Sequence, residues 1–285
     1  MKRAPTALFS VARKETRRHH IPRAAELMAG TRTVVVPPDV VVDRLRSTTL
    51  VMGVDIETAD WVDRHNSTSK GQFGCFNLCH PDDFNQRIVQ IGWAVGGVCD
   101  DEPVQRTEEY LVKPDGFVIS EKATAKHGIS TDRTLSGGHA LDIVLCKFME
   151  TAADIDARGG CIVAHHLEFD AGIIDRELAN AGLACWRPQW SAIARTGICT
   201  MDPYIGGWVQ ECMGKDAHND EKSKPMLSLK DAADLLLPKT DTIRRLRERS
   251  HTAGADAQLH RLVYIAMRAL VGRSQSLEPR TSVAC

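Results

Sequence analysis

The sequence predicts an α/β fold in which helices flank both faces of a mixed five-stranded sheet. Three strand-like segments follow one another in the first half of the chain, strand-like and helix-like segments then alternate, and no internal repeat is present. Successive strands favour antiparallel pairs, whereas alternation favours parallel strands joined by helices, so one sheet should contain both. With 285 residues, of which 43% are hydrophobic and 26% charged, the chain can bury a full core.

The five strand-like segments are marked in different ways. The first is an apolar run with a carboxylate at every second position near its end, which is typical of a strand with acids on one face. The second is a longer apolar run, the third ends before a proline, the fourth follows a Gly-Gly turn and the fifth precedes a polar loop. The expected strands are residues 50–57, 87–95, 108–112, 161–165 and 197–201.

Helical spacing of apolar residues marks five further segments. One of them is closed by Gly182, a residue that commonly ends helices, and the last carries an apolar stripe between Leu259 and Leu270. The expected helices are residues 121–127, 139–157, 168–181, 228–237 and 253–271.

The basic start of the chain differs in composition from the rest. We interpret it as a flexible solvated tail, with an arm for nucleic-acid phosphates or an organelle-targeting segment as alternatives. Residues 34–42 are strand-prone but contain two prolines, so an edge or arm conformation is expected there. The expected divisions are a basic, flexible extension over 1–47, a domain over 48–272 with insertions at about 59–86 and 202–226, and a flexible tail over 273–285.

Charge and composition narrow the functional classes. The net charge of −1 gives no global basic field, although a groove in such a protein can be locally basic. No apolar run approaches the roughly 20 residues of a membrane span, so no membrane partner is expected. The nine cysteines and the missing signal-peptide pattern predict reduced thiols in an intracellular protein, cytoplasmic or nuclear unless the basic start directs it to an organelle.

Cys75, Cys79 and His80 are spaced as three ligands of a zinc ion. The candidates for a fourth ligand are Cys99, Cys199, Cys212 and His218. No second Cys-x-x-Cys or His-x-x-x-His pair, which would complete a common zinc motif, accompanies the cluster. A zinc-stabilised interaction protein is therefore kept only as an alternative.

Acidic residues next to predicted strands give the most direct indication of chemistry. Asp55 and Glu57 are two apart on a strand, so their carboxylates point the same way, and a divalent cation would relieve their repulsion. Asp170 stands at a helix start just after the fourth strand, where open sheets build their sites. His251 precedes the last helix, and Asp256 lies in its first turn. Taken singly, each acid is better explained by a solvated strand end or a helix-dipole contact.

Together these residues resemble the DnaQ-like DEDDh 3′–5′ exonucleases. The shared pattern is Asp-x-Glu on the first strand, His-x-x-x-Phe-Asp after the fourth, and His-x-x-x-x-Asp before the last helix. Connecting segments that also resemble the family are residues 88–92, 125–130 and 227–233. Two departures are Ala59-Asp60, where Thr-Gly is common, and His166, where Asn is common.

The resemblance implies a ribonuclease H-like fold and a catalytic set. In that set, Asp55, Glu57, Asp170 and Asp256 would hold two Mg²⁺ or Mn²⁺ ions, and His251 would be the general base. The residues implied to contact the terminal nucleotide are Ile56, Thr58, His127, Gly128 and His165.

The implied activity is release of nucleoside 5′-monophosphates from a nucleic acid with a free 3′ end, single-stranded by preference. The His-Gly-Ile segment favours a DNA proofreading or repair enzyme, and a separate polymerase subunit would then be a partner. RNA trimming or turnover is the alternative within the enzyme class, because nothing in the motifs reports on the 2′-hydroxyl. A non-catalytic nucleic-acid-binding module is the alternative outside it.

Overall fold

The structure is a computed structural model that describes residues 37, 39–45, 48–60, 86–98, 106–213 and 226–276. Most of the basic extension, most of the first insertion and the zinc candidates Cys75, Cys79 and His80 lie outside these residues. In the described part of the chain, no helix is both long and apolar enough to cross a membrane.

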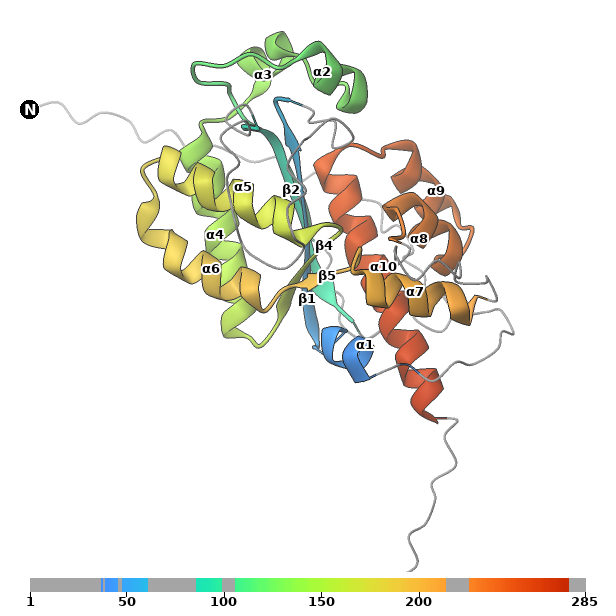
Figure 1. The fold of residues 1–285 in the computed structure, drawn as a ribbon. Coiled ribbons are helices and arrows are strands. Elements are labelled where there is room, and N and C mark those ends of the chain that lie inside the picture. The colour runs from blue at the N-terminus through green and yellow to red at the C-terminus, as the bar shows by residue number, and fades with distance from the viewer. Residues whose placement is uncertain are drawn as a thin grey trace, which may run out of the picture.

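Five strands form one mixed sheet (Figure 1). In their order across the sheet, they are β3 (Arg106–Leu111), β2 (Ile88–Gly97), β1 (Leu50–Thr58), β4 (Cys161–Ala164) and β5 (Ile198–Cys199). β2 is antiparallel to both β1 and β3, whereas β4 is parallel to both β1 and β5. The predicted mixed five-stranded sheet is therefore confirmed, with β1 at its centre.

Helices cover both faces of this sheet, as predicted (Figure 1). One face carries α4 (Leu141–Ala157), α5 (Leu167–Asn180) and α6 (Arg187–Arg195), with the short 3-10 helix η3 (Ala184–Trp186). The other face carries α1 (Asp39–Arg44), α7 (Pro203–Cys212), α8 (Leu229–Leu236), α9 (Asp241–Glu248) and α10 (Ala253–Ser276). Beyond the end of β1 lie α2 (Glu121–His127) and α3 (Thr131–Gly137), at the top of Figure 1.

Side chains of β1 alternate between two hydrophobic cores. Met52, Val54 and Ile56 pack into the core shared with α4, α5 and α6. Val51 packs into the core on the α10 side. Because successive residues of a strand point to opposite faces, Asp55 and Glu57 lie on the same face as Val51 and so on the side of α10.

Two glycines allow α10 to lie directly on the sheet. A Cβ atom at Gly53 would stand 2.0 Å from the carbonyl oxygen of Ala257, and one at Gly92 would stand 2.3 Å from the carbonyl carbon of Ala253. No side chain fits at either position unless the helix moves. This close approach brings the first turn of α10, which contains Asp256, to the acidic end of β1.

The stretch expected in an edge or arm conformation contains the helix α1 instead. It begins at Asp39, directly after two prolines, and Val41 within it and Leu45 just after it are completely buried. The four-residue spacing of these apolar side chains gives a helix one buried face, which outweighs the strand propensity of the valines. Both pack into the α10-side core, although the domain was expected to begin at residue 48.

The second insertion, expected as a polar loop, begins with the helix α7. Asp202 caps it, because its carboxylate accepts the N–H groups of Tyr204 at 2.9 Å and Ile205 at 3.4 Å, and Pro203 occupies the first turn. The buried face of the helix consists of Ile205, Gly206, Trp208, Val209 and Cys212. Asp-Pro is a helix-start signal, but the polar and glycine-rich composition of the segment concealed it.

Three short helices, α3, α6 and α9, were not expected, and β5 is shorter than predicted. A short helix has few turns in which an apolar period can be recognised. The residues that cap such a helix are therefore better sequence indicators of it than its interior. Ser130 caps α3 by accepting the N–H of Arg133 at 3.2 Å, and Thr240 caps α9 by accepting the N–H of Ile243 at 3.3 Å.

Candidate metal and catalytic site

The four predicted carboxylates meet at the end of β1. Asp55 and Glu57 come from β1, Asp170 from the first turn of α5, and Asp256 from the first turn of α10. Burial raises the pKa of Asp55 well above its usual range, and the charges of Asp170, Glu57 and Asp256 raise it further. The sheet and two helices thus bring together acids from three distant segments of the chain.

β1 is longer than β4, and on this side only its residues Val51 to Gly53 pair with β4. Side chains bond the backbone beyond that point. The Nδ1–H of His260 donates to the carbonyl oxygen of Val54 at 2.7 Å, and the N–H of Ile56 donates to the carboxylate of Asp170. The acidic end of β1 is therefore anchored by both α5 and α10.

The start of α10 is held by the neighbouring strands. The N–H of Ala253 donates to Oε1 of Gln90 at 3.0 Å, and the N–H of Gly254 donates to Oε2 of Glu109 at 3.0 Å. Both bonds satisfy N–H groups that a helix start leaves without an intrahelical partner. Asp256, in the same turn, is consequently fixed relative to β2 and β3.

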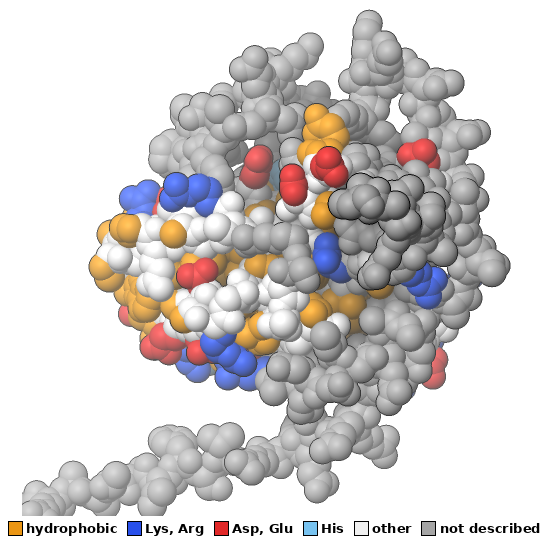
Figure 2. Space-filling model, turned by 90° about the horizontal axis from the view of Figure 1, so that it is seen from below, with side chains coloured by type: hydrophobic (Ala, Val, Ile, Leu, Met, Phe, Trp, Pro, Cys, Tyr) orange, Lys and Arg blue, Asp and Glu red, His pale blue; other side chains and the backbone are white. Residues whose placement is uncertain are grey.

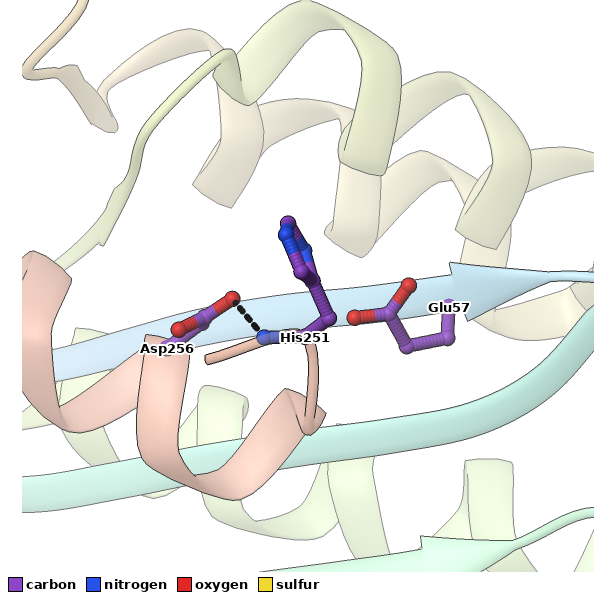
Figure 3. A group of neighbouring side chains, drawn as sticks. All are labelled: Glu57, His251 and Asp256. Carbon is purple, nitrogen blue, oxygen red and sulfur yellow. Dashed lines mark hydrogen bonds between the residues drawn. The ribbon is translucent and has the colours of Figure 1, made fainter. Parts of the chain in front are cut away.

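His251 lies on the loop before α10 in a left-handed backbone conformation, with a φ of 66°. For a residue with a side chain this conformation costs about 1–3 kcal/mol and is frequent at functional sites. Its N–H donates to Oδ2 of Asp256 at 3.0 Å (Figure 3). Glu57, His251 and Asp256 each place a ligand atom within 4.8 Å of the others, a spacing suited to one metal ion.

Burial disfavours the charged form of these acids. It raises the pKa of Glu57 and of Asp170 to about 8 and that of Asp256 to about 6. The charges of Asp256 and Asp170 raise the pKa of Glu57 further, whereas Lys126 lowers it. Backbone N–H groups favour the charged forms of Asp170 and Asp256 without overcoming the effect of burial.

The donor atoms fit a divalent metal. Oδ1 of Asp256 is buried and has no hydrogen-bond partner among the described residues. A buried carboxylate oxygen without a donor, within a cluster of acids whose pKa values are raised, is an arrangement that a cation would complete. The carboxylate oxygens suit Mg²⁺ or Mn²⁺.

His127 and Gly128, predicted to contact substrate, end α2 beside the end of β1. The Nε2–H of His127 donates to the carbonyl oxygen of Thr58 at 3.2 Å, and its Nδ1 accepts the N–H of Ile129 at 3.0 Å. Gly128 has a φ of 71° and caps the helix by donating its N–H to Thr124. The protein uses both ring nitrogens of His127, so this residue places α2 against β1.

His165, also predicted to contact substrate, forms hydrogen bonds with the protein through both ring nitrogens. Its Nε2–H donates to the carbonyl oxygen of Leu227 at 2.9 Å, and its Nδ1 accepts the hydroxyl of Thr200 at 2.9 Å. Burial lowers the pKa of His165 to about 4, which keeps the ring neutral in this bonding pattern. Neither ring nitrogen is therefore open to a substrate. Ile56 and Thr58, the other side chains predicted to contact the nucleotide, are buried as well.

His260 belongs to the site but was not predicted from the sequence. Its Nε2 lies 3.8 Å from Oδ1 of Asp55. Burial, and after it the charge of His165, lowers the pKa of His260 to about 3. Because the Nδ1–H is bonded to Val54, the lone pair of Nε2 remains next to Asp55. One sequence signal was available: His260 follows Asp256 by one helical turn, within an apolar stretch.

His166, the departure from the family pattern, has a φ of 108° and precedes the first turn of α5. Its ring stacks on Phe169, with ring centroids 5.7 Å apart, and its carbonyl oxygen accepts the N–H of Phe169 at 2.9 Å. The helix start that carries Asp170 is therefore set by a strained residue and a local ring contact.

Comparison with known proteins bears on the fold. No protein-family model and no curated protein sequence matches this chain. Among solved structures, E. coli Exonuclease I in complex with a dA16 oligonucleotide matches with a TM-score of 0.51 and 16% identity, over 80% of this chain and 42% of that chain. The complex with a dT13 oligonucleotide matches with a TM-score of 0.52 and 15% identity, over 80% of this chain and 42% of that chain. The apo enzyme matches with a TM-score of 0.51 and 16% identity, over 81% of this chain and 43% of that chain.

This chain therefore spans less than half the length of the solved structures that it matches. At these identities the likeness shows the fold and leaves the activity to be argued from the site. The sheet order β3-β2-β1-β4-β5, with helices on both faces, is that of the ribonuclease H-like fold.

Proposed function

We propose that this protein is a metal-dependent 3′–5′ exonuclease that releases nucleoside 5′-monophosphates from single-stranded DNA. The proposal depends mainly on one observation, the meeting of four acids with His251 at the end of β1. Buried acids with raised pKa values favour a cation, and a histidine beside them favours acid–base chemistry.

The acids would hold Mg²⁺ or Mn²⁺ through Asp55, Glu57, Asp170 and Asp256. When bound, a pair of such ions would neutralise the charge that develops on the attacking and leaving oxygens of a phosphodiester. The backbone orients the ligands for this task, because the N–H of Ile56 bonds Asp170 and the N–H of His251 bonds Asp256.

His251 would be the general base. Burial lowers its pKa, and the charges of Lys126 and His127 lower it further, so its ring is neutral and accepts a proton at neutral pH. The bond to Asp256 uses the main-chain N–H, so the ring is left to take a proton from the attacking water.

DNA is the proposed substrate because the structures that share this fold include complexes with dA16 and dT13 oligonucleotides. The backbone around Thr58 and the segment from His127 to Gly128 would hold the terminal nucleotide, since the two lie together at the end of β1. RNA is the alternative substrate. A proofreading role would require a polymerase as partner.

The test is a time course on 5′-labelled single strands of DNA and RNA of matched sequence, with Mg²⁺, Mn²⁺ or EDTA. The wild type should shorten a strand from its 3′ end only when metal is present. Asp55→Asn and Asp170→Asn should each lower the rate by about 100-fold or more, because each removes a charged metal ligand. Asp142→Asn changes an exposed acid of α4 and should cleave like the wild type.

Full activity in Asp55→Asn or Asp170→Asn would refute the assignment of the site. The strand that is shortened faster identifies the substrate. If neither strand is shortened under any metal condition, the protein is better described as a non-catalytic nucleic-acid-binding module.

A further inference from the structure

A cleft opens beside the acids. Its volume is about 760 Å³. Its lining comes from the segment that runs from α8 through α9 to the first two turns of α10, with Lys126 from α2. His251 and Asp256 belong to this lining, so the cleft is continuous with the proposed catalytic site. The described surface seen from below also mixes basic, acidic and hydrophobic side chains (Figure 2).

The arginines of the cleft are balanced by acids. Arg244 pairs with Asp241 at 2.9 Å and with Glu248 at 2.7 Å. Arg247 pairs with Asp234. The two arginines and three acids of these pairs leave this side of the cleft with a net charge of −1, so the lysines decide the sign of the cleft.

Lys230 stands in the first turn of α8, and Lys239 lies between α8 and α9. Both are exposed, and neither forms an ion pair with another described residue. Lys126 adds a third positive charge, close enough to the acids to lower the pKa of Glu57 and of Asp256. The three lysines outweigh the surplus acid of the ion pairs and leave the lining away from Asp256 with a net charge of +2.

Apolar side chains lie among these charges. They are Leu229, Ala233, Leu237, Pro238, Ile243 and Leu259. A volume of this size takes a ligand as large as a nucleotide. Positive charge along an apolar groove is the combination that single strands require, because phosphates need cations while sugars and bases pack against apolar surface.

We propose that this surface, the lysine cleft, binds the sugar–phosphate backbone of the strand whose end lies at the acids. Lys230 and Lys239 contact phosphates of that strand, and Lys126 contacts the backbone nearest the acids. The inference rests on the proposed function for its orientation, since the acids mark where the strand ends. It adds a binding site outside the predicted substrate-binding residues, all of which lie on β1, at the end of α2 or after β4.

The test measures binding without cleavage. Anisotropy of a labelled oligothymidylate of about 20 nucleotides, longer than the usual sites of such grooves, is followed in EDTA over a series of salt concentrations. Each phosphate contact contributes about −0.7 to the slope of log affinity against log salt. The double variant Lys230→Gln/Lys239→Gln should therefore have a slope shallower by about 1.4 and bind roughly ten-fold more weakly at moderate salt.

Lys113→Gln/Lys147→Gln is the matched control, because it removes two exposed lysines that do not line the cleft, one of them on α4. It should keep the wild-type slope. Lys230→Arg/Lys239→Arg should also keep it, since the charges are retained. Equal slopes for the cleft variant and the control would overturn the inference.

Strand cleavage measured in parallel separates this inference from the proposed function. If the wild type shortens the strand and the cleft variant has an unchanged salt slope, the inference about the lysine cleft is overturned and the proposed exonuclease stands. A shallower slope in a protein that never shortens a strand overturns the exonuclease alone and supports binding at the cleft.

Discussion

Asp170 accepts backbone N–H groups that favour its charged form, yet its burial favours the protonated form. Its pKa of about 8 lies above the usual 3.8, so without metal the folded protein keeps a proton that the unfolded chain releases. Stability from this group is fully present below a pH of about 4 and is lost as the pH rises through about 8. Glu57, whose pKa is also raised to about 8, acts in the same direction.

Asp170→Asn should therefore stabilise the metal-free protein at high pH, because asparagine keeps an acceptor for the N–H of Ile56 but cannot ionise. We expect its Tm at a pH of about 8 to rise by roughly 3–6 °C, and to fall less steeply than that of the wild type between about pH 5 and 8. Calorimetry in EDTA measures both. Asp142→Asn, at an exposed position, should change neither, and a lower Tm for Asp170→Asn would contradict this account.

His260 should act as a positioning residue for Asp55. His260→Leu would leave the carbonyl of Val54 buried without its donor, at a cost of about 1–3 kcal/mol in unfolding free energy. It should also weaken Mn²⁺ binding by about ten-fold, as is usual when a side chain that orients a ligand is lost. Urea unfolding and calorimetric titration with Mn²⁺ measure the two effects.

The control is Gln258→Leu on the same helix, which removes an exposed bond to Thr107. It should cost less stability and leave Mn²⁺ binding intact. If Gln258→Leu weakened Mn²⁺ binding as much as His260→Leu, the effect would belong to α10 as a whole and not to the contact with Asp55.

The residues that carry the chemistry could be predicted because their spacing from a strand end or helix start is local. The residues that fix their positions through hydrogen bonds could not be predicted. Gln90 bonds Ala253 across 163 residues of chain, and Glu109 bonds Gly254 across 145. No local pattern encodes such contacts. The contacts of His127 with Thr58 and of His165 with Thr200 and Leu227 could not be predicted either, since they form only when distant segments meet.

At the scale of elements, the contact between α10 and β1 decides whether the acids meet. Gly53→Ala would place a Cβ 2.0 Å from the carbonyl oxygen of Ala257, so helix and strand must separate. We expect a loss of about 1–3 kcal/mol in unfolding free energy, and a loss of metal affinity because Asp256 moves with the helix. Denaturant unfolding and Mn²⁺ titration measure both.

Gly207→Ala provides the comparison, because a Cβ at this position in α7 meets no atom within 4 Å. It should be neutral or stabilise the protein by about 0.5–1 kcal/mol, as an alanine does within a helix. Equal behaviour of the two variants would show that the glycine contact does not hold α10 in place.

The strands and longer helices were predictable because burial on one or both faces leaves a periodic apolar pattern. The helix α9 was not, since its eight residues are largely charged and only Ile243 and Leu246 are buried. The helix α1 was not, because valines favour strands until a neighbouring surface covers one helical face. Tertiary packing decides these segments, and a single sequence does not display it.

At the scale of the whole molecule, the fold followed from the order of strands and helices, but the lysine cleft did not. Its lining comes from α2, α8, α9 and α10, and the net charge of −1 gives no sign of it. A local field depends on which charges are paired, as Arg244 and Arg247 show, and pairing is a property of the folded surface.

The bond between Val54 and His260 joins residues 206 positions apart in the chain. During synthesis at about 5–20 residues per second, the acidic face of β1 therefore waits on the order of ten seconds or more for the helix that covers it. Such non-local closure is slow in folding as well. The cation site would be among the last features to form. A nascent chain stalled before α10 would carry three of the four acids yet lack the metal site, which keeps the proposed nuclease inactive until the last helix has docked.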